Sequence, residues 1–455
     1  MRNDNSSYFI HFKKVLSQSR DKTALIYQDT AYTYQELEAA IEKWQTEFEA
    51  KGIRAGDEVV LIGDFDPASI SCFFALLSIN TIIIPLLRSH TKEYIELAID
   101  ITHADHLIKI DNSLSSEVLK LEAGPKHHLI SEVQQGQHPG LILFSSGSTG
   151  KPKAAVHNFS KLLSRFIIEP HYQRMINFLM FDHWGGLNTL LYILSGAGTV
   201  ITTENRSPEN ICHLIEKWQV ATLPTSPSFL NLLLLSQSYE GKNLDSLKLI
   251  TYGSEPMPVS TLERARKIFP QAIFKQTYGL IELGVFKTKS KSSDSLFLKI
   301  DPRDCLSRIV DGKLELKTET AMLGYLNAES PFTHDGWFKT GDVVEVDGEF
   351  IRILGRDSEV INVGGEKVFP IEVEDVILQF PNVEDVFVYK EAHPLMGSIV
   401  CAKVKVMEKT DEREFIINLK KHCALYLARF KIPTKIKFSE DAFSNTRQKK
   451  SRLKL

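Results

Sequence analysis

Small and polar residues that could hold a phosphate group follow a short apolar run near residue 141. The run Leu141–Phe144 predicts a buried strand. The chain continues with Ser, Gly and Thr residues and a Lys-Pro-Lys ending: Ser145, Ser146, Gly147, Ser148, Thr149, Gly150, Lys151, Pro152 and Lys153. Small residues let backbone N–H groups and hydroxyls approach phosphate oxygens, and the lysines add positive charge. The stretch therefore predicts a phosphate-binding loop.

The spacing of this loop differs from that of a Walker A loop, which needs four residues between its first Gly and its Gly-Lys pair. Here only Ser148 and Thr149 separate Gly147 from Gly150, and Pro152 prevents a helix from running smoothly out of the loop. A flexible Ser/Gly linker is the alternative interpretation. Linkers seldom follow a buried strand directly and end in Lys-Pro-Lys, so we favour a phosphate loop of another type.

The stretch SSGSTGKPK resembles the [ST]SG[ST]TGxPK loop of the adenylate-forming (ANL) superfamily. This superfamily includes acyl- and aryl-CoA synthetases, the adenylation domains of peptide synthetases and firefly-type luciferases. The resemblance implies that ATP and Mg²⁺ bind here, with residues 145–153 around the β- and γ-phosphates. Thr149 would then lie near Mg²⁺, and Lys153 would act as a counter-charge.

Two further segments resemble superfamily motifs that surround the nucleotide. Gly253, Ser254 and Glu255 begin a G-S-E-P sequence that resembles the G-[AS]-E-P turn over the adenine and acyl sites. The sequence TYGLIE, which starts at Thr277, resembles the Y-G-x-T-E motif. The resemblance therefore assigns nucleotide contacts to both segments.

The second segment carries several implied roles. Thr277 and Gly279 would border the nucleotide, and Tyr278 would stack on the adenine ring. Glu282 would be a catalytic residue that holds Mg²⁺ between the phosphates, a task that suits a hard carboxylate. The usual Thr of the motif is Ile281 here, which removes a hydroxyl near the α-phosphate and puts the adenylation rate in question.

His183 is a catalytic candidate in the acyl pocket. It precedes the sequence WGGL, and this run resembles the superfamily segment F-H-x-x-G-L, whose His lies near the reacting carboxylate. A core histidine at a strand-to-helix corner is the alternative. In a second register, Phe181–Asp182 resembles the F-D pair of amino-acid-activating domains, whose Asp holds the substrate ammonium. The Gly-Gly-Leu favours the acyl or aryl register, and Trp184 favours a short pocket for small or aryl acids.

A long stretch at residues 335–374 resembles the superfamily pattern W-x-x-T-G-D followed by G-R-x-D. The resemblance implies that Asp342 accepts both ribose hydroxyls and that Arg356 contacts ribose or phosphate. It also implies a hinge directly after this Arg. The usual Asp or Lys of the hinge is Ser358 here, but a hinge needs residues that absorb backbone rotation rather than one particular side chain.

The tail NTRQKKSRLKL resembles the superfamily's T-x-x-G-K ending, whose catalytic lysine bridges the substrate carboxylate and the α-phosphate. Lys450 lies four residues after Thr446, and Lys449 occupies the usual Gly position. Both lysines therefore stay candidates for the catalytic role. A merely solvated basic tail is the alternative interpretation.

The elements that must position these residues alternate along the chain. Strands followed by helices in residues 24–87 indicate parallel sheets covered on both faces. Short alternating strands with Asp-Gly turns in residues 285–355 predict a small antiparallel barrel. We expect an α/β fold with two parallel α/β sheet subdomains and this barrel in residues 1–355. A hinge at 356–359 and a small mobile α+β domain at 360–455 would follow.

The composition gives no reason to expect nucleic acid or a membrane as the main partner. The chain has 455 residues with 54 Lys plus Arg and 57 Asp plus Glu, so its net charge is −3. Ala68–Leu87 is free of charge, but its change in texture predicts a buried helix, a turn at Ile79–Asn80 and a strand. The N-terminus does not resemble a secretory signal, and the cysteines form no C-x-x-C pair. We therefore expect a cytoplasmic protein without a stable membrane span.

The resemblance implies an ATP-dependent carboxylic acid ligase. A small carboxylic acid would form an acyl-AMP and pyrophosphate, and the acyl group would pass to a thiol, for which CoA is favoured. One alternative is an acyl- or amino-acid-adenylating ligase that loads the phosphopantetheine of a separate carrier protein. Another is a degenerate homologue that binds a nucleotide or acyl ligand without turnover. Ile281, Ser358 and the altered tail fit that alternative, whereas Lys153, Glu282 and Asp342 argue against it.

Overall fold

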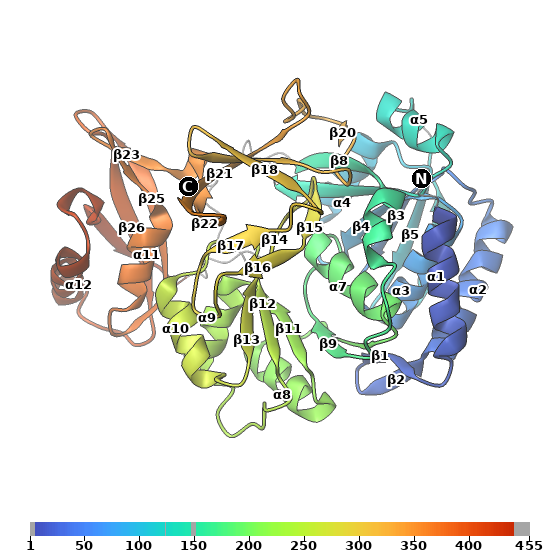
Figure 1. The fold of residues 1–455 in the computed structure, drawn as a ribbon, viewed down its shortest axis with the longest axis horizontal. Coiled ribbons are helices and arrows are strands. Elements are labelled where there is room, and N and C mark those ends of the chain that lie inside the picture. Colours follow the sequence, from blue (N-terminus) through green and yellow to red (C-terminus); the bar gives the residue numbers. More distant parts are fainter. Residues whose placement is uncertain (1–4, 123, 147–151, 441–455) are drawn as a thin grey trace.

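The computed structural model describes residues 5–122, 124–146 and 152–440, and Figure 1 shows their arrangement. Two mostly parallel sheets of seven strands each form the larger part of the molecule, together with an antiparallel sheet of six strands. A smaller sheet with helices of its own follows at the C-terminal end, on the left of Figure 1. The architecture is the expected α/β fold with a large N-terminal part and a small α+β part.

The first seven-stranded sheet contains the apolar runs of the N-terminal third of the chain. Its strands pair in parallel from β7 to β5 and antiparallel toward both edges. Every residue of β3 and β4 is buried, as expected of strands that are covered on both faces. In sheet order the strands are β20 (Gly324–Tyr325), β8 (Pro152–Asn158), β7 (Gly140–Ser146), β4 (Ile82–Leu87), β3 (Glu58–Gly63), β5 (His106–Ile110) and β6 (Ser116–Lys120).

The uncharged segment 68–87 folds as a helix, a turn and a strand. α3 (Pro67–Ser78) is capped by Asp66, whose side chain accepts a hydrogen bond from the Ser69 amide, and β4 follows. Asn80, in the turn between them, has a left-handed backbone with φ 59°. Among the helices of the described residues, none is long and apolar enough to cross a membrane. The prediction of a buried helix-turn-strand unit is therefore confirmed.

The second seven-stranded sheet is parallel except for the β1–β2 hairpin. In sheet order its strands are β13 (Ile273–Gln276), β12 (Leu249–Tyr252), β11 (Thr222–Thr225), β9 (Arg174–Asn177), β10 (Thr199–Thr202), β1 (Thr23–Tyr27) and β2 (Thr30–Thr33). Buried side chains of α3, α7, β1 and β3 belong to one hydrophobic cluster, so the two sheets share a core.

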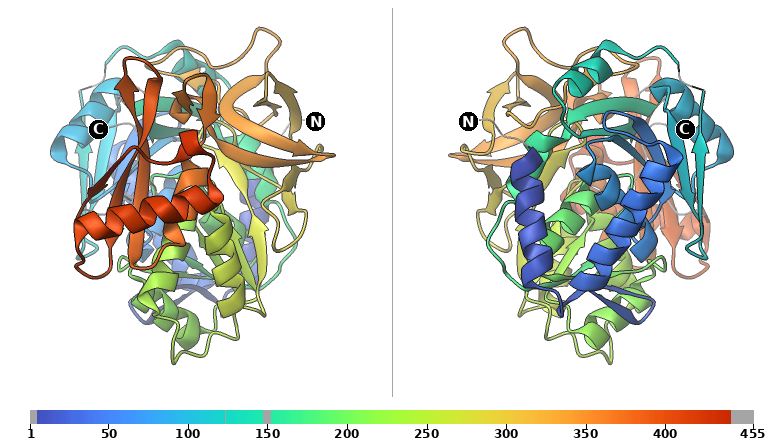
Figure 2. Two further views of the ribbon diagram at one scale, coloured as in Figure 1. Left: turned by 90° about the vertical axis from the view of Figure 1, so that its left-hand side faces the viewer. Right: turned by 90° about the vertical axis from the view of Figure 1, so that its right-hand side faces the viewer.

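In the described part of the chain, nine further α-helices and the 3₁₀ helix η1 (Ser164–Phe166) cover the two sheets, and α1 and α2 lie side by side on the outside (Figure 2). α2 begins with a capping box, in which the Thr33 hydroxyl accepts from the Glu36 amide and the Glu36 carboxylate accepts from the Thr33 amide. The helical segments are α1 (Asn5–Gln18), α2 (Tyr34–Lys51), α4 (Lys92–Thr102), α5 (His128–Gln135), α6 (Phe159–Leu163), α7 (Trp184–Ser195), α8 (Pro208–Trp218), α9 (Pro227–Ser236) and α10 (Val259–Ile268).

Residues 278–356 supply the short strands that were expected between the large sheets and the C-terminal part. The predicted Asp-Gly turn at Asp311–Gly312 has φ 51° and 74°, which joins two antiparallel strands. After the hairpin of β14 (Tyr278–Leu280) and β15 (Gly284–Phe286) comes a six-stranded antiparallel sheet. Its order is β16 (Thr288–Ser290), β17 (Leu298–Ile300), β22 (Phe350–Arg356), β21 (Phe338–Asp347), β19 (Lys313–Lys317) and β18 (Leu306–Val310).

The C-terminal part has a hydrophobic core of its own. Val388 and Ala402 of its central strands share this core with Val373 of one helix and Leu419 of the other. The elements are η2 (Asp357–Glu359), β23 (Ile361–Val363), β24 (Glu366–Val368), α11 (Pro370–Leu378), β25 (Val383–His393), β26 (Gly397–Val406), α12 (Glu412–Tyr426), η3 (Arg429–Lys431) and β27 (Lys435–Phe438).

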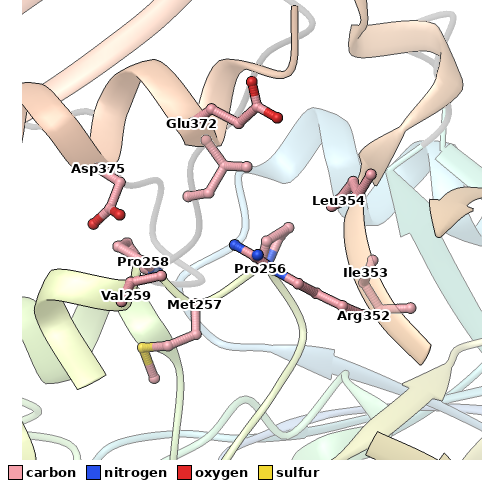
Figure 3. Close-up of a pocket in the computed structure, with 10 residues that line it drawn as sticks. Pro256, Met257, Pro258, Val259, Arg352, Ile353, Leu354, Glu372 and Asp375 are labelled. Atoms are coloured by element: carbon pink, nitrogen blue, oxygen red, sulfur yellow. The ribbon is translucent and has the colours of Figure 1, made fainter. Parts of the chain in front are cut away.

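The N-terminus of α10 is capped by a residue of the C-terminal part. Pro258, at the N-cap position, has no capping side-chain bond. Instead, Asp375 of α11 accepts hydrogen bonds from the Ser260 amide (3.0 Å) and hydroxyl (2.5 Å). Figure 3 shows Asp375 beside Pro258 and Val259 at this junction. One carboxylate of the C-terminal part therefore binds a backbone amide at the start of α10 that has no acceptor within its own helix.

We expect Asp375→Ala to weaken this junction by about 1 kcal/mol, the usual cost of losing a helix cap. Hydrogen exchange at the Ser260 amide should become faster because its acceptor is lost. Asp411→Ala is the control, since Asp411 caps α12 within the C-terminal part through the Glu414 amide. Unchanged exchange at Ser260 in the Asp375 variant would contradict the capping role.

His157 is a buried histidine on β8 that contacts no charged partner. It is 1% exposed, and neither ring nitrogen makes a hydrogen bond of normal geometry within the described part of the chain. Burial lowers the pKa of His157 from 6.5 to about 4, and an interaction with the Ile281 backbone opposes this only in part. The ring is therefore neutral in the folded protein at pH 7.

This burial predicts an acid-sensitive contribution to stability. The contribution is fully present above pH 6.5 and is lost as the pH falls toward 4, because only the unfolded histidine binds a proton there. The stability lost between pH 7 and pH 5 amounts to about 2 kcal/mol. The urea midpoint of His157→Gln should therefore fall less between pH 7 and pH 5 than that of the unmodified protein. His334→Gln, at an exposed histidine, is the control; equal falls in all three proteins would refute the prediction.

Candidate active site

The two strands that flank the predicted phosphate loop form an antiparallel pair. Ser145 pairs with Lys153, so the ends of the loop lie side by side on β7 and β8. The side chain of Asn327 holds the second strand, accepting from the Ala154 amide (3.0 Å) and donating to the Pro152 carbonyl (2.9 Å). Gly147, Ser148, Thr149, Gly150 and Lys151 lie outside the described residues, as does the side chain of Ser146.

Glu282 lies in the turn between β14 and β15 and is held against the same edge of the first sheet. Its Oε1 accepts a hydrogen bond from the Tyr325 hydroxyl (2.6 Å), and its carbonyl accepts from the Met322 amide (2.7 Å). The Lys153 ammonium lies 5.4 Å from the centre of the Tyr325 ring. The structure thus brings together Glu282, Lys153 and the start of the phosphate loop.

Tyr278, Asp342 and Arg356 form a second cluster. Asp342 is 5% exposed; its Oδ2 accepts from the Tyr278 hydroxyl and its Oδ1 lies 2.9 Å from Arg356 Nε. The pairing of β21 with β22 places Asp342 directly opposite Arg356. Burial raises the pKa of Asp342, and Arg356 and Tyr278 oppose that shift. The cluster therefore presents a paired, inward-facing carboxylate beside an aromatic ring.

The turn Gly253–Glu255 leaves the carboxyl end of β12 beside Thr277, which follows β13. A β-carbon at Gly253 would lie 2.4 Å from the Thr277 hydroxyl, so only glycine fits this close approach. Ser254 has a left-handed backbone with φ 73°. Glu255 Oε1 accepts from the Ser228 amide (2.8 Å) at the start of α9, so this carboxylate supports the turn. Gly253 and Thr277, both predicted to border the nucleotide, are thus adjacent.

His183 is the N-cap of α7, and its Nδ1 accepts from the Gly185 amide (3.2 Å). The neighbouring Asp182 is 3% exposed, and its Oδ2 lies 2.7 Å from His90 Nε2. One carboxylate oxygen of Asp182 is thus engaged by His90. Trp184 is 2% exposed and packs edge-on against Phe159 in the core.

The candidate site lies where three sheets meet. Tyr278 and Glu282 belong to one short hairpin, and they contact the antiparallel sheet and the first large sheet, respectively. Among the described residues no cluster of three or more acidic, His or Cys side chains could hold a metal ion. A single carboxylate such as Glu282 fits Mg²⁺ that arrives with phosphate oxygens and water as its remaining ligands.

Some of the predicted site residues lie outside the part of the chain that the structure describes. Lys449 and Lys450 lie outside the described part of the chain, which ends at residue 440. Tyr325 and Asn327 are site residues that the sequence did not indicate. They fall in the stretch LGYLN, whose apolar residues predict packing, and their partners are distant in sequence.

Known proteins are similar to this chain over nearly its whole length. A family model described as AMP-binding enzyme matches residues 12–297, and one described as AMP-binding enzyme C-terminal domain matches residues 372–450. A 2-succinylbenzoate–CoA ligase of Listeria monocytogenes is 26% identical over 94% of both chains. An indoleacetate–CoA ligase of Aromatoleum aromaticum is 24% identical over 92% of both.

Two solved structures show the same fold. An anthranilate CoA ligase, AuaEII, in complex with anthranoyl-AMP, has a TM-score of 0.82 at 18% identity, with 98% of this chain and 95% of that chain covered. The o-succinylbenzoate CoA synthetase of Bacillus subtilis, bound to its acyl-adenylate, has a TM-score of 0.77 at 21% identity, with 97% and 96% covered. Since the first family model alone spans more than half of the sequence, the chain belongs to the AMP-binding enzyme family.

Proposed function

We propose that the protein is an ATP-dependent carboxylic acid ligase that makes an acyl-AMP and then an acyl thioester. The observation that carries this proposal is the convergence of Glu282 and Lys153 with the Tyr278–Asp342–Arg356 cluster at one junction of three sheets. Glu282 and Lys153 suit phosphate groups with their metal ion, and the Tyr278–Asp342–Arg356 cluster suits a nucleoside. A carboxylate oxygen attacks the α-phosphorus of ATP, and pyrophosphate leaves with the electrons of the broken P–O bond.

In the first step the chain's residues position and neutralise charge rather than move protons. The loop 145–153 would hold the β- and γ-phosphates, with Thr149 as a metal ligand and Lys153 as a counter-charge. Asp342 accepts from the ribose hydroxyls, and the Tyr278 ring stacks on adenine. Mg²⁺, when bound by Glu282 and Thr149 together with phosphate oxygens, supplies charge neutralisation. His183 lines the acyl pocket.

The second step requires the adenylate to meet a thiol. We propose that residues 1–355 form the adenylation domain, 356–359 the hinge and 360–455 a mobile domain that carries the catalytic lysine. The separate core of the C-terminal part supports this division. The hinge segment is contacted from both sides, because Lys313 pairs with Asp357 (2.8 Å) and Lys390 donates to the Ser358 carbonyl (3.3 Å).

We propose CoA as the thiol and an acid with an aromatic ring as the substrate. The relatives and neighbours described above are CoA ligases named for 2-succinylbenzoate, indoleacetate and anthranilate. The acyl register at His183 supports the same class. The phosphopantetheine of a carrier protein is the competing acceptor. ATP, CoA and five free, buried cysteines are consistent with a cytoplasmic location.

The first experiment measures ATP-dependent pyrophosphate release over a panel of aryl, short-chain and amino acids, each with and without CoA. We expect sustained release with an aryl acid only when CoA is present, because the thiol regenerates the free site. A single burst that CoA does not extend would point to a carrier protein. No release and no hydroxamate with any acid would support the degenerate homologue instead.

The catalytic lysine can be assigned by separating the two half-reactions. We expect Lys450→Ala to lower adenylation at least 100-fold, since a positioned cation stabilises the charge of phosphoryl transfer. Thioester formation from supplied acyl-AMP should be largely retained. Lys449→Ala is the matched control, and the reverse pattern in the two variants would move the catalytic role to Lys449.

A further inference from the structure

Tyr325 contacts three parts of the candidate site, although it lies outside the sequence motifs that predict the site. It lies on β20, a two-residue strand that pairs antiparallel with β8, opposite Ala155 (Figure 1). Its side chain is 9% exposed. β20 follows the strands β18 and β19, so the chain returns from the antiparallel sheet to the phosphate-loop hairpin at this point.

The hydroxyl of Tyr325 makes a short bond to the proposed metal ligand. It donates to Glu282 Oε1 at 2.6 Å, a distance typical of a hydroxyl bound to a charged carboxylate. Ser145, at the start of the phosphate loop, interacts with the same hydroxyl.

The residues before Tyr325 hold the main chain of the Glu282 turn. The Met322 amide donates to the Glu282 carbonyl (2.7 Å), and the Thr320 hydroxyl donates to the Leu283 carbonyl (3.0 Å). The segment 320–325 therefore restrains both the backbone and one carboxylate oxygen of Glu282. A carboxylate oxygen that accepts one hydrogen bond keeps a further lone pair, so the bond from Tyr325 would orient the Glu282 carboxylate without blocking a metal.

We propose that Tyr325 is a positioning residue that fixes the Glu282 carboxylate for the metal bound to the ATP phosphates and couples it to Ser145 of the phosphate loop. This inference rests on the proposed role of Glu282. Hydrogen bonds that orient a metal ligand commonly change metal affinity by about 10- to 100-fold when they are removed. A purely structural hydroxyl would change stability alone.

The test uses Tyr325→Phe, which removes one hydroxyl and keeps the ring beside Lys153. Calorimetry measures binding of a non-hydrolysable ATP analogue to the full chain, with and without Mg²⁺ and with Mn²⁺ as a second probe. We expect the metal-dependent gain in affinity to fall about 10-fold, while affinity for the metal-free analogue stays unchanged. In turnover, the Mg²⁺ concentration for half-maximal rate should rise more than the rate at saturating Mg²⁺ falls.

Tyr34→Phe is the matched control because it also removes a buried hydroxyl, one that donates to the Gly198 carbonyl (2.7 Å) just before β10. It should lower the melting temperature without altering metal dependence. Glu282→Gln distinguishes failure of the proposed metal site from failure of the inference about Tyr325. If it keeps the full metal dependence, or if the unmodified chain binds no nucleotide, the proposed site fails and Tyr325 with it. If only Glu282→Gln loses metal dependence while Tyr325→Phe behaves like Tyr34→Phe, the inference on Tyr325 alone is overturned.

Discussion

Buried carboxylates that must be paired determine how the sheets of this protein meet. Asp64, at the end of β3, is bound by Arg206, which follows β10 of the other large sheet (2.8 and 2.9 Å). Asp66 is fully buried and is bound by Arg88 after β4, and Arg88 in turn pairs with Glu204, which follows β10 (2.8 Å). Removing one partner of such a pair typically costs about 3–5 kcal/mol, because the remaining charge is left in a poorly solvated place. The relative placement of the sheets is therefore specified by charge as well as by apolar packing.

The same constraint applies to the candidate site. Asp342 and Glu282 each accept from a tyrosine hydroxyl contributed by another segment. Such bonds hold an acceptor in one orientation before any ligand binds, so less side-chain conformational entropy is lost on binding. Tyr278 and Glu282 share one hairpin, so order at the nucleoside cluster is transmitted over a few residues to the phosphate side.

Local chemistry explains which features could be predicted from the sequence. Segment 68–87 was predictable because its change from helix-like to β-branched residues falls at Asn80, which tolerates a left-handed backbone. The capping box of α2 was predictable because Thr33 and Glu36 are three residues apart. The pairing of Asp342 with Arg356 depends on strand register and is local to one hairpin. In each of these cases the interacting residues are close together in the sequence.

Partners that are distant in sequence were not predictable. Tyr325 lies 43 residues from Glu282, and Asp375 lies 115 residues from Ser260. Ile281 shows the same limit. As a departure from a motif it suggested only a lost hydroxyl, whereas in the structure its side chain belongs to the large hydrophobic cluster and its backbone faces His157. Only the folded arrangement shows that this position stabilises the core.

The cap that Asp375 provides for α10 has a consequence for the turn Gly253–Glu255, which lies just before that helix. Helix stability and the docking of the C-terminal part are linked equilibria, because one carboxylate serves both. Linkage is reciprocal. If docking of the C-terminal part favours an ordered turn, a ligand that orders the turn favours docking by the same free energy. Order in the turn is thus transmitted to the adjoining N-terminus of α10, where Asp375 binds, without a separate regulatory site.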